Sequence, residues 1–321
     1  MDNKNILSVR DLSVNFRLRH GDLPAVRNVS FDLAQGERLG LVGESGAGKS
    51  VTGFSILGLV SKPGYIAGGQ VLFQGVDLAS MSQEQLRDIR GNRISMIFQD
   101  PMMTLNPVLT IGTQMVETLM AHRRITRRDA EIIALDKLRK VHISSPERRL
   151  KQYPHELSGG MRQRIVIAIA LLTEPALIIA DEPTTALDVT IQAEIMDLLL
   201  HLCRAERMGL ILITHDLAVV SQVTERIAVM YAGTIVEMGK TADIIGYPSH
   251  PYTRGLLAAL PQSANGRRLN QIPGSMPSLR SIPSGCAFQN RCSSCEEVCR
   301  GSVPILEPKQ KGCLAACHLL D

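Results

Sequence analysis

The sequence predicts an α/β fold with an N-terminal antiparallel β subdomain, an inserted α-helical subdomain and a small C-terminal cysteine-rich module. A short apolar run, Arg38–Val42, leads through a glycine-rich loop into helical spacing over Val51–Leu59. Two further apolar runs, Ala176–Ala180 and Leu210–Ile213, flank a helical segment, as buried parallel strands do in α/β proteins. Six of the seven cysteines lie within Cys286–Cys317, which marks a separate module.

The N-terminal third of the chain favours strands. Ile6–Val9, Ser13–Phe16 and Val29–Leu33 are short runs rich in β-favouring residues. The turn-forming sequence His20-Gly21-Asp22 separates two of them. These runs predict the antiparallel β subdomain that precedes the glycine-rich loop.

A helical insertion is predicted from about residue 100 to residue 170. Within it, Arg127–Val141 has amphipathic spacing, and Thr126 stands where a helix N-cap is expected, with Asp129 three residues later. The segment Pro248–Pro283 is rich in Pro, Gly and Ser and connects the core to the cysteines. We therefore predict one large domain over 1–260 and a C-terminal extension over 261–321.

Composition narrows the class of protein. Hydrophobic residues make up 45% and charged residues 21% of the 321 residues, as in ordinary globular proteins. The net charge of +4, without a dense Lys/Arg run, argues against a nucleic-acid partner.

The longest apolar run, Ile165–Leu172, is far shorter than the roughly 18 residues of a membrane span. The N-terminus does not resemble a secretory signal, so we expect a cytosolic protein that reaches a membrane only through a partner.

The glycine-rich loop fits the pattern G-x-x-x-x-G-K-S/T, in which backbone N–H groups surround phosphate oxygens at a helix N-terminus. Its residues are Gly43, Glu44, Ser45, Gly46, Ala47, Gly48, Lys49 and Ser50. We predict that Lys49 pairs with the β- and γ-phosphates of ATP, that Ser50 ligates Mg²⁺, and that Val51 completes this part of the ATP site. We call this loop the P-loop.

Two carboxylates follow the apolar run Ala176–Ala180. A P-loop enzyme needs one acid for Mg²⁺ and another group for the attacking water, and such groups are expected at the end of a buried strand. We assign Asp181 to Mg²⁺ and Glu182 to the general base. Without the P-loop upstream, the same pair could equally be the polar end of a strand.

The sequence Leu157-Ser158-Gly159-Gly160-Met161 places a serine N-cap and two glycines at the start of a helix. Such a helix start offers N–H groups and a positive dipole end to an anion. The motif resembles the signature LSGGQ of the ABC ATPase family, with Met161 in place of the usual glutamine. The resemblance covers Ile6 to Leu260.

This resemblance implies roles for four more residues. Gln99 matches the lid glutamine that senses Mg²⁺ and water, and His215 matches the switch histidine that contacts the γ-phosphate. Asp188 matches the loop that crosses the dimer interface, and Phe16 stands where an aromatic residue stacks on adenine. The family also implies a head-to-tail dimer, in which the P-loop of one subunit faces Ser158, Gly159 and Gly160 of the other.

The C-terminal part carries a narrower resemblance. His250–Leu257, followed by a Pro-rich stretch and Gly285–Phe288, resembles the extension of oligopeptide and dipeptide importer ATPases. Nickel and glutathione importers share this extension. It implies a second ATPase subunit of a different sequence, two transmembrane permease subunits and an extracytoplasmic binding protein. The chain would then sit at the cytoplasmic face of the membrane.

The competing function is a soluble ABC-type ATPase of translation or DNA repair. Proteins of that type commonly contain two cassettes or long coiled-coil insertions. This sequence has one P-loop cassette and neither insertion. It therefore favours an ATP-hydrolysing subunit that powers import of di- or oligopeptides or a related small solute.

The cysteines suit either zinc or an iron–sulfur cluster. Spacing alone slightly favours a compact zinc site of Cys292 and Cys295 with Cys313 and either Cys317 or His318. The family resemblance instead matches Cys286, Cys292, Cys299 and Cys317, where members of the group carry a 4Fe–4S cluster. Thiols without any ligand are the third alternative.

Overall fold

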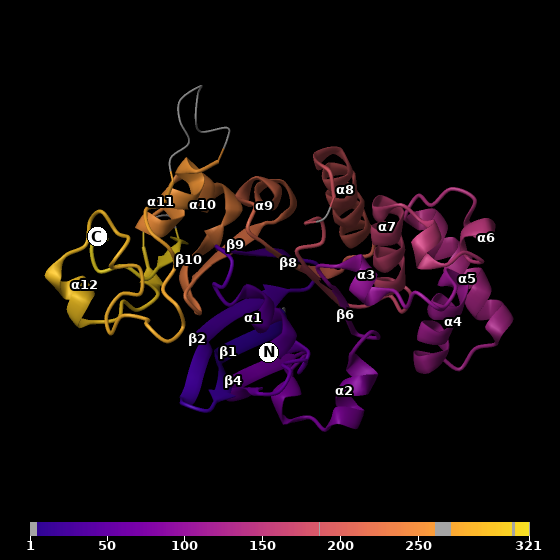
Figure 1. Cartoon of the computed structure of the whole chain (residues 1–321), viewed down its shortest axis with the longest axis horizontal. Helices are drawn as coiled ribbons and strands as arrows, with labels where there is room; N and C mark the ends of the chain where they lie inside the picture. The colour runs from indigo at the N-terminus through magenta and orange to yellow at the C-terminus, as the bar shows by residue number, and fades with distance from the viewer. Residues whose placement is uncertain (1–4, 186, 261–270, 310–311, 321) are drawn as a thin grey trace. The chain divides into compact units, whose positions relative to one another are not determined.

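The structure is a computed structural model that describes residues 5–185, 187–260, 271–309 and 312–320. Its contacts divide the chain into two compact units (Figure 1). The larger unit combines Met1–Ser80 with Leu212–Asp321, and the smaller unit is Met81–Ile211. The smaller unit is therefore an insertion within the sequence of the larger unit.

The larger unit begins with an antiparallel sheet in the order β2-β1-β4-β5. Its elements are β1 (Asn5–Leu18), β2 (Gly21–Ala34), β4 (Gly64–Phe73), β5 (Val76–Asp77) and the 3-10 turn η1 (Leu78–Ser80). β1 pairs with both β2 and β4, and β4 pairs with both β1 and β5, so β1 and β4 are the inner strands. This sheet confirms the predicted N-terminal antiparallel subdomain.

β1 is one long strand where the sequence predicts two short ones. Polar residues Arg10 and Asp11 interrupt the apolar pattern, but pairing continues past them with shifts in register on both sides. Asp11 adopts a left-handed backbone conformation, with φ 47°. A β-bulge of this kind bends a strand without ending it, which a pattern of propensities does not reveal.

A second set of strands in the larger unit has the order β11-β12-β10-β9-β3. Its elements are β3 (Arg38–Val42), β9 (Arg226–Tyr231), β10 (Thr234–Lys240), β11 (Glu307–Pro308) and β12 (Leu314–Ala315), with helices α1 (Lys49–Ile56), α9 (Leu217–Val223), α10 (Thr241–Gly246), α11 (Pro251–Ala258) and α12 (Glu297–Gly301). β3 pairs in parallel with β9, whereas β9 and β10 are antiparallel. All five residues of β3 are buried, which explains why apolar residues and glycine follow Arg38 without a break.

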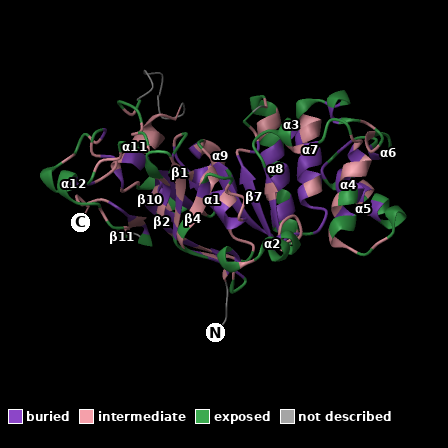
Figure 2. Cartoon of the chain, turned by 60° about the horizontal axis from the view of Figure 1, so that its bottom comes forward, coloured by how far each residue is buried: buried purple, intermediate pink, exposed green. Residues whose placement is uncertain are grey.

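The smaller unit contains a parallel pair of strands and most of the long helices. Its elements are α2 (Gln83–Ile89), β6 (Ile94–Ile97), α3 (Pro101–Thr104), α4 (Ile111–His122), α5 (Arg127–Lys140), α6 (Pro146–Arg149), the 3-10 turn η2 (Pro154–Glu156), α7 (Gly159–Ala170), β7 (Leu177–Asp181) and α8 (Val189–Ala205). β7 is fully buried and pairs in parallel with β6 (Figure 2). The boundary between the units falls inside β8 (Gly209–Thr214).

Helix α5 matches the amphipathic helix predicted over Arg127–Val141, whereas the bounds of about 100–170 for the whole helical insertion stay a prediction. Thr126 accepts a hydrogen bond from the Asp129 N–H at 3.2 Å and donates its hydroxyl to the Asp129 carboxylate at 2.7 Å. On the buried side, the Lys137 ammonium is paired with Glu174 at 3.3 Å and Glu206 at 3.6 Å. These two carboxylates stabilise an otherwise costly buried charge and fix α5 within its unit.

The cysteine-rich segment joins the strands of the larger unit through β12. Glu237 of β10 pairs with Ala315, and Met238 pairs with Leu314. The first ten residues of the predicted extension, 261–270, lie outside the described residues. A domain boundary near residue 260 therefore stays a prediction. Within the described part of the chain, no helix is both long and apolar enough to cross a membrane.

Candidate functional site

The P-loop connects β3 to α1 in the larger unit, as predicted. The helix begins at Lys49, and Gly48 caps it in the left-handed conformation, with φ 100°. A Cβ atom on Gly48 would lie 2.9 Å from the Ala25 carbonyl oxygen, and one on Gly43 would clash with the Met230 carbonyl. Only glycine fits at these two positions, so the loop can turn tightly enough to present its N–H groups at a helix N-terminus.

Lys49 is folded back over the P-loop. Its side chain is only 5% exposed, and its ammonium donates to the Gly43 carbonyl at 2.8 Å and the Glu44 carbonyl at 3.0 Å. These two bonds hold the ammonium beside the loop whose N–H groups suit phosphate oxygens. The geometry is compatible with the predicted pairing of Lys49 with phosphates.

Two other predicted residues lie in the larger unit. Phe16 is half-buried in β1 and pairs with Gly64 of β4. The phenyl ring of Phe16 lies close over Gly64, where a Cβ atom would come within 2.8 Å of the ring. His215 is exposed and directly follows β8. The next residue, Asp216, caps α9 by accepting from the Ala218 N–H at 2.8 Å. This cap fixes the backbone at the end of the histidine's loop.

Glu182 and Gln99 come together in the smaller unit. Asp181 ends β7 and is 3% exposed, and Glu182 follows with a left-handed φ of 45°. The Gln99 amide donates to Oε2 of Glu182 at 3.1 Å. The Thr185 hydroxyl donates to the same oxygen at 2.8 Å. Two hydrogen bonds thus orient the predicted base, as a general base requires.

Sequence reasoning missed Thr185. A threonine three residues after an acid can bond back to it locally, and its hydroxyl also contacts the Glu182 carbonyl at 3.3 Å. The spacing was a usable signal. It gave no hint, however, that the backbone of Glu182 adopts a left-handed conformation, which is uncommon for a residue with a side chain.

The predicted signature serine and Asp188 both cap helices. Ser158 accepts from the Met161 N–H at 3.4 Å at the start of α7, and Asp188 accepts from the Ile191 N–H at 3.0 Å at the start of α8. A Cβ atom on Gly160 would lie 3.0 Å from the Ile191 side chain, so the two helix starts are neighbours. Ser158, Gly159 and Asp188 are exposed. A pair of exposed helix N-termini favours binding of an anion.

The six cysteines of the C-terminal segment occupy three places. Cys286, Cys292, Cys299 and Cys317 line one small cavity together with His250, Phe288 and His318. Cys295 does not line it, and its thiol lies 3.7 Å from the Glu296 carbonyl. Cys313 is buried against β10, where a Cβ atom on Gly239 would clash with its sulfur. No disulfide joins the cysteines of the described residues.

Burial changes the chemistry of the clustered thiols. It raises the pKa of Cys286 to about 11, with the neighbouring thiols adding to the effect, and it raises the pKa of Cys292 in the same direction. Without a positive partner these groups stay protonated at neutral pH. Among the residues that the structure describes, no three His, Cys, Asp or Glu side chains are arranged to hold a single metal ion.

His250 and Glu237 fix helix α11 beside this cluster. The Glu237 carboxylate is fully buried and accepts from the N–H groups of Ser249 at 2.6 Å and His250 at 3.1 Å. The Nδ1 atom of His250 caps the helix by accepting from the Tyr252 N–H at 3.0 Å. Burial lowers the pKa of His250 to about 4, so its ring stays neutral and keeps this acceptor.

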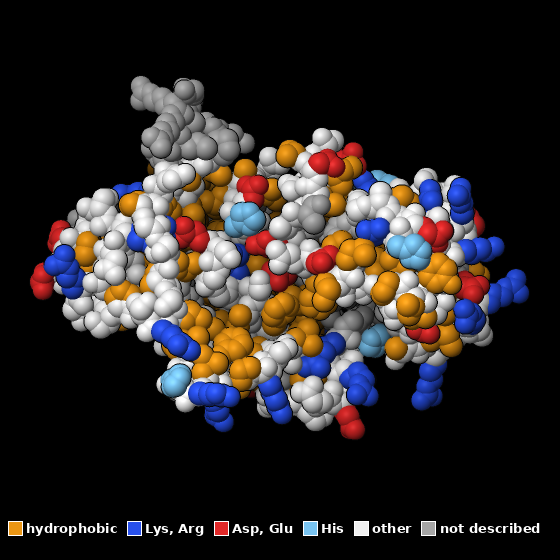
Figure 3. Space-filling model, viewed as in Figure 1, with side chains coloured by type: hydrophobic (Ala, Val, Ile, Leu, Met, Phe, Trp, Pro, Cys, Tyr) orange, Lys and Arg blue, Asp and Glu red, His pale blue; other side chains and the backbone are white. Residues whose placement is uncertain are grey.

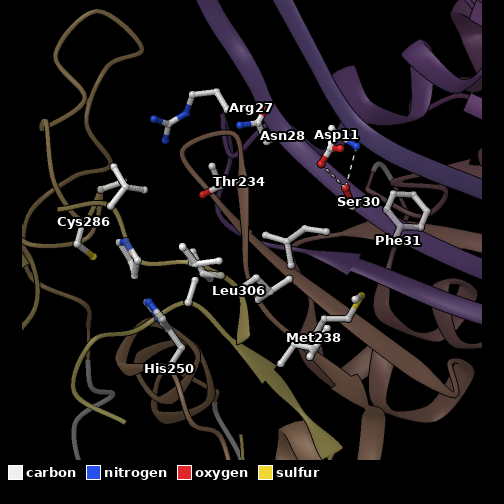
Figure 4. A pocket seen from close by; sticks show the side chains of 18 of the residues that line it. Asp11, Arg27, Asn28, Ser30, Phe31, Thr234, Met238, His250, Cys286 and Leu306 are labelled. Atoms are coloured by element: carbon white, nitrogen blue, oxygen red, sulfur yellow. Dashed lines mark hydrogen bonds between the residues drawn. The ribbon is translucent and has the colours of Figure 1, made fainter. Parts of the chain in front are cut away.

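A larger cavity of about 950 Å³, which shares the lining residues His250, Cys286 and Phe288 with the cysteine cavity, lies in the larger unit (Figure 4). Side chains from β1, β2 and β10 line it, with His250, Cys286 and Leu306 from later parts of the chain. Ser30 and Asp11, which form a hydrogen bond of 3.1 Å, are among the residues that line it. The described lining includes none of the residues predicted to bind ATP, so this cavity is distinct from the predicted site.

Charged side chains do not gather into one basic area on the visible face of the molecule. Lys and Arg side chains occur at several separate places, with Asp and Glu side chains among them (Figure 3). This distribution agrees with the small net charge of +4. The absence of a nucleic-acid partner stays a prediction.

Two family descriptions match this chain. Residues 26–185 match the ABC transporter family, and residues 236–299 match the oligopeptide/dipeptide transporter C-terminal region. The first match includes the P-loop, Gln99, Ser158, Asp181 and Glu182. The second begins in β10 and ends at Cys299.

Relatives match over nearly the full length. The dipeptide transport ATP-binding protein DppD of Bacillus subtilis is 52% identical over 99% of this chain and 96% of its own. The oligopeptide transport ATP-binding protein OppD of Escherichia coli is 47% identical over 97% and 92%. Among solved structures, the dimeric post-hydrolysis ATP-binding cassette MJ0796 with ADP and phosphate superposes with a TM-score of 0.66 at 27% identity, covering 73% of this chain and 98% of that one.

Proposed function

We propose that this chain, which belongs to the ABC transporter family as an ATP-binding subunit with the oligopeptide/dipeptide C-terminal region, powers the import of di- or oligopeptides. Family membership makes it an ATP-hydrolysing subunit. One observation carries the peptide assignment: identity of about half extends through the C-terminal region to relatives named for dipeptide and oligopeptide transport. The same region gives no support to a role in translation or DNA repair.

The residues predicted to bind ATP and Mg²⁺, and the predicted base, each have a part in hydrolysis. The P-loop and Lys49 bind the phosphates of ATP, and Phe16 stacks on the adenine. Glu182, oriented by Gln99 and Thr185, accepts the proton of the attacking water. His215 contacts the γ-phosphate. Ser50, Gln99 and Asp181 would hold Mg²⁺, which neutralises charge that develops on the phosphates.

The partners follow from the predicted dimer. Ser158, Gly159, Gly160 and Asp188 offer exposed helix N-termini to the nucleotide of a second subunit. The dimeric state of the MJ0796 cassette supports this arrangement. We propose that the second subunit is a different ATPase and that two permeases and an extracytoplasmic binding protein complete the importer. The chain would act at the cytoplasmic face of the membrane.

Copurification tests this assembly. The chain carries a C-terminal affinity tag and is extracted with mild detergent from its native cells, and its partners are identified by mass spectrometry. We expect two multi-span membrane proteins and one further ATP-binding subunit in stoichiometric amounts. Recovery with ribosomes or DNA-repair proteins, without any membrane protein, would contradict the proposal.

We also propose that Cys286, Cys292, Cys299 and Cys317 hold a 4Fe–4S cluster. These four cysteines line one cavity, which supports them as the ligand set. Cys295 and Cys313 lie elsewhere, which argues against the compact zinc site that needs both. A cluster takes each of four thiolates at a different iron, so four cysteines that line one cavity suit it. When bound, the cluster would supply cross-links in a segment with little apolar core.

Anaerobic purification tests the cluster. The wild-type protein should be brown and contain about four irons per chain, because four thiolates suit a 4Fe–4S cluster. Cys292→Ser should lose most of the iron, whereas Cys295→Ser, three residues away, should keep it. Stoichiometric zinc without iron, or equal loss of iron from both variants, would contradict the assignment.

A further inference from the structure

The C-terminal segment contacts the P-loop through an ion pair that joins residues 247 positions apart in the sequence. The Arg291 guanidinium donates to Oε2 of Glu44 at 2.6 Å and to Oε1 at 2.9 Å. The pair is therefore bidentate, the geometry in which arginine binds a carboxylate most strongly. Glu44 is the second residue of the P-loop.

Arg291 is itself held rigidly. Its side chain is 5% exposed, and its Nε atom donates to the Pro273 carbonyl at 2.9 Å. Its guanidinium lies 5.9 Å from the centre of the Tyr231 ring and 6.0 Å from that of Phe288. A cation fixed by a carbonyl and two aromatic rings keeps its direction, so it can impose a position on Glu44.

A second contact fixes the backbone at the same residue. The Glu44 N–H donates to the hydroxyl oxygen of Tyr252 at 2.8 Å. Tyr252 is fully buried in α11 and packs edge-on against Tyr231, with ring centres 4.7 Å apart. Met276, in the segment between α11 and the cysteines, reaches to 3.8 Å from a Cβ atom placed on Gly46. Three side chains from this part of the chain thus approach the P-loop.

The position of Glu44 matters for binding of a polyanion. The backbone carbonyl of Glu44 accepts a hydrogen bond from the Lys49 ammonium, so a shift of the Glu44 backbone would move the lysine side chain. Its carboxylate is a negative charge within the loop predicted to hold phosphates. Unpaired, it would repel them, whereas the guanidinium of Arg291 neutralises it.

We propose that Arg291 is a positioning residue of the ATP site, which fixes and neutralises Glu44 so that the P-loop accepts the phosphates. The C-terminal segment is thereby a functional part of the nucleotide site. This inference rests on the proposed ATP-binding function. It assigns Arg291 no contact with ATP.

A double-mutant cycle tests the inference by measuring the dissociation constant of ATP together with kcat and KM. Arg291→Met should weaken ATP binding about tenfold, a coupling common for contacting charged residues. The value of kcat at saturating ATP should change less than about twofold. Arg291 supports binding of the phosphates equally in the ground state and in the transition state, so its loss does not change the barrier between them. Glu44→Gln removes the charge that Arg291 neutralises. In the double variant ATP binding should therefore return to within about threefold of wild type.

Two further variants separate this role from a structural one. Arg291→Lys keeps the cation and the fold but cannot form two parallel bonds, so we expect binding about threefold weaker than wild type. Arg300→Met, in the same segment and largely exposed, is the matched control and should bind ATP normally. Melting temperatures of all variants are compared.

The outcomes are distinct. Recovery of ATP binding when Glu44→Gln is added to Arg291→Met supports the inference, because lost packing would not be restored by that change. Normal ATP binding by both Arg291 variants, or equal weakening with and without Glu44→Gln, overturns it. Failure of the wild-type protein to bind ATP would instead overturn the proposed function.

Discussion

Replacing Glu182 by glutamine should abolish ATP turnover while leaving ATP binding intact. A general base contributes about 10²- to 10⁴-fold, so we expect kcat to fall at least about 100-fold. Glutamine has nearly the same shape, and its amide oxygen can still accept from Gln99 and Thr185. The change therefore removes the base without removing the geometry. Phosphate release measures turnover, and equilibrium binding measures affinity.

Glu84→Gln is the matched control, because Glu84 is exposed in α2 and plays no part in the site. Its kcat should equal that of the wild type. The Glu182→Gln protein should accumulate ATP-bound dimers, which size-exclusion chromatography with light scattering detects. Undiminished phosphate release by Glu182→Gln would remove Glu182 from the role of general base.

Replacing Lys49 by alanine should nearly eliminate ATP binding. A charge-assisted hydrogen bond contributes about 1.5–3 kcal/mol, so loss of the contacts to two phosphates should raise the dissociation constant by about 100-fold or more. ADP should lose less affinity than ATP, because it lacks the γ-phosphate. Isothermal titration with both nucleotides measures this difference.

The change also removes two bonds from the Lys49 ammonium to the loop carbonyls. Thermal unfolding therefore has to accompany the titration, with Lys151→Ala, an exposed lysine, as the control. We expect normal ATP binding by Lys151→Ala. A Lys49→Ala protein that is folded and binds ATP like the wild type would contradict the assignment of the P-loop.

Local patterns in the sequence predict the elements around the site. The mainly apolar runs at β3, β7 and β8 are buried strands, because a strand covered on both faces needs apolar residues on both of its sides. The G-x-x-x-x-G-K-S/T loop needs glycine for steric reasons that the structure bears out at Gly43 and Gly48. The N-cap at Thr126 depends on side chains only three residues apart.

Contacts between distant residues could not be predicted in this way. No periodicity relates Arg291 to Glu44, and nothing local distinguishes Cys299 from Cys295 as a member of the cluster. Their positions depend on how the segment after α11 packs against β10 and the P-loop. The bulge at Asp11 could not be predicted for a related reason. β1 pairs with a strand on each side, and this pairing outweighs the local preference of polar residues to end a strand.

Uptake of a radiolabelled dipeptide tests the central claim most directly, namely that ATP hydrolysis by this chain powers peptide import. The copurified complex is reconstituted into liposomes with its binding protein on one side and ATP on the other. With the wild-type chain, we expect uptake that requires ATP and stops when unlabelled peptide competes. With Glu182→Gln, uptake should fall to the level without ATP. Equal uptake by the two complexes, or ATP hydrolysis that peptide and binding protein never stimulate, would contradict the account.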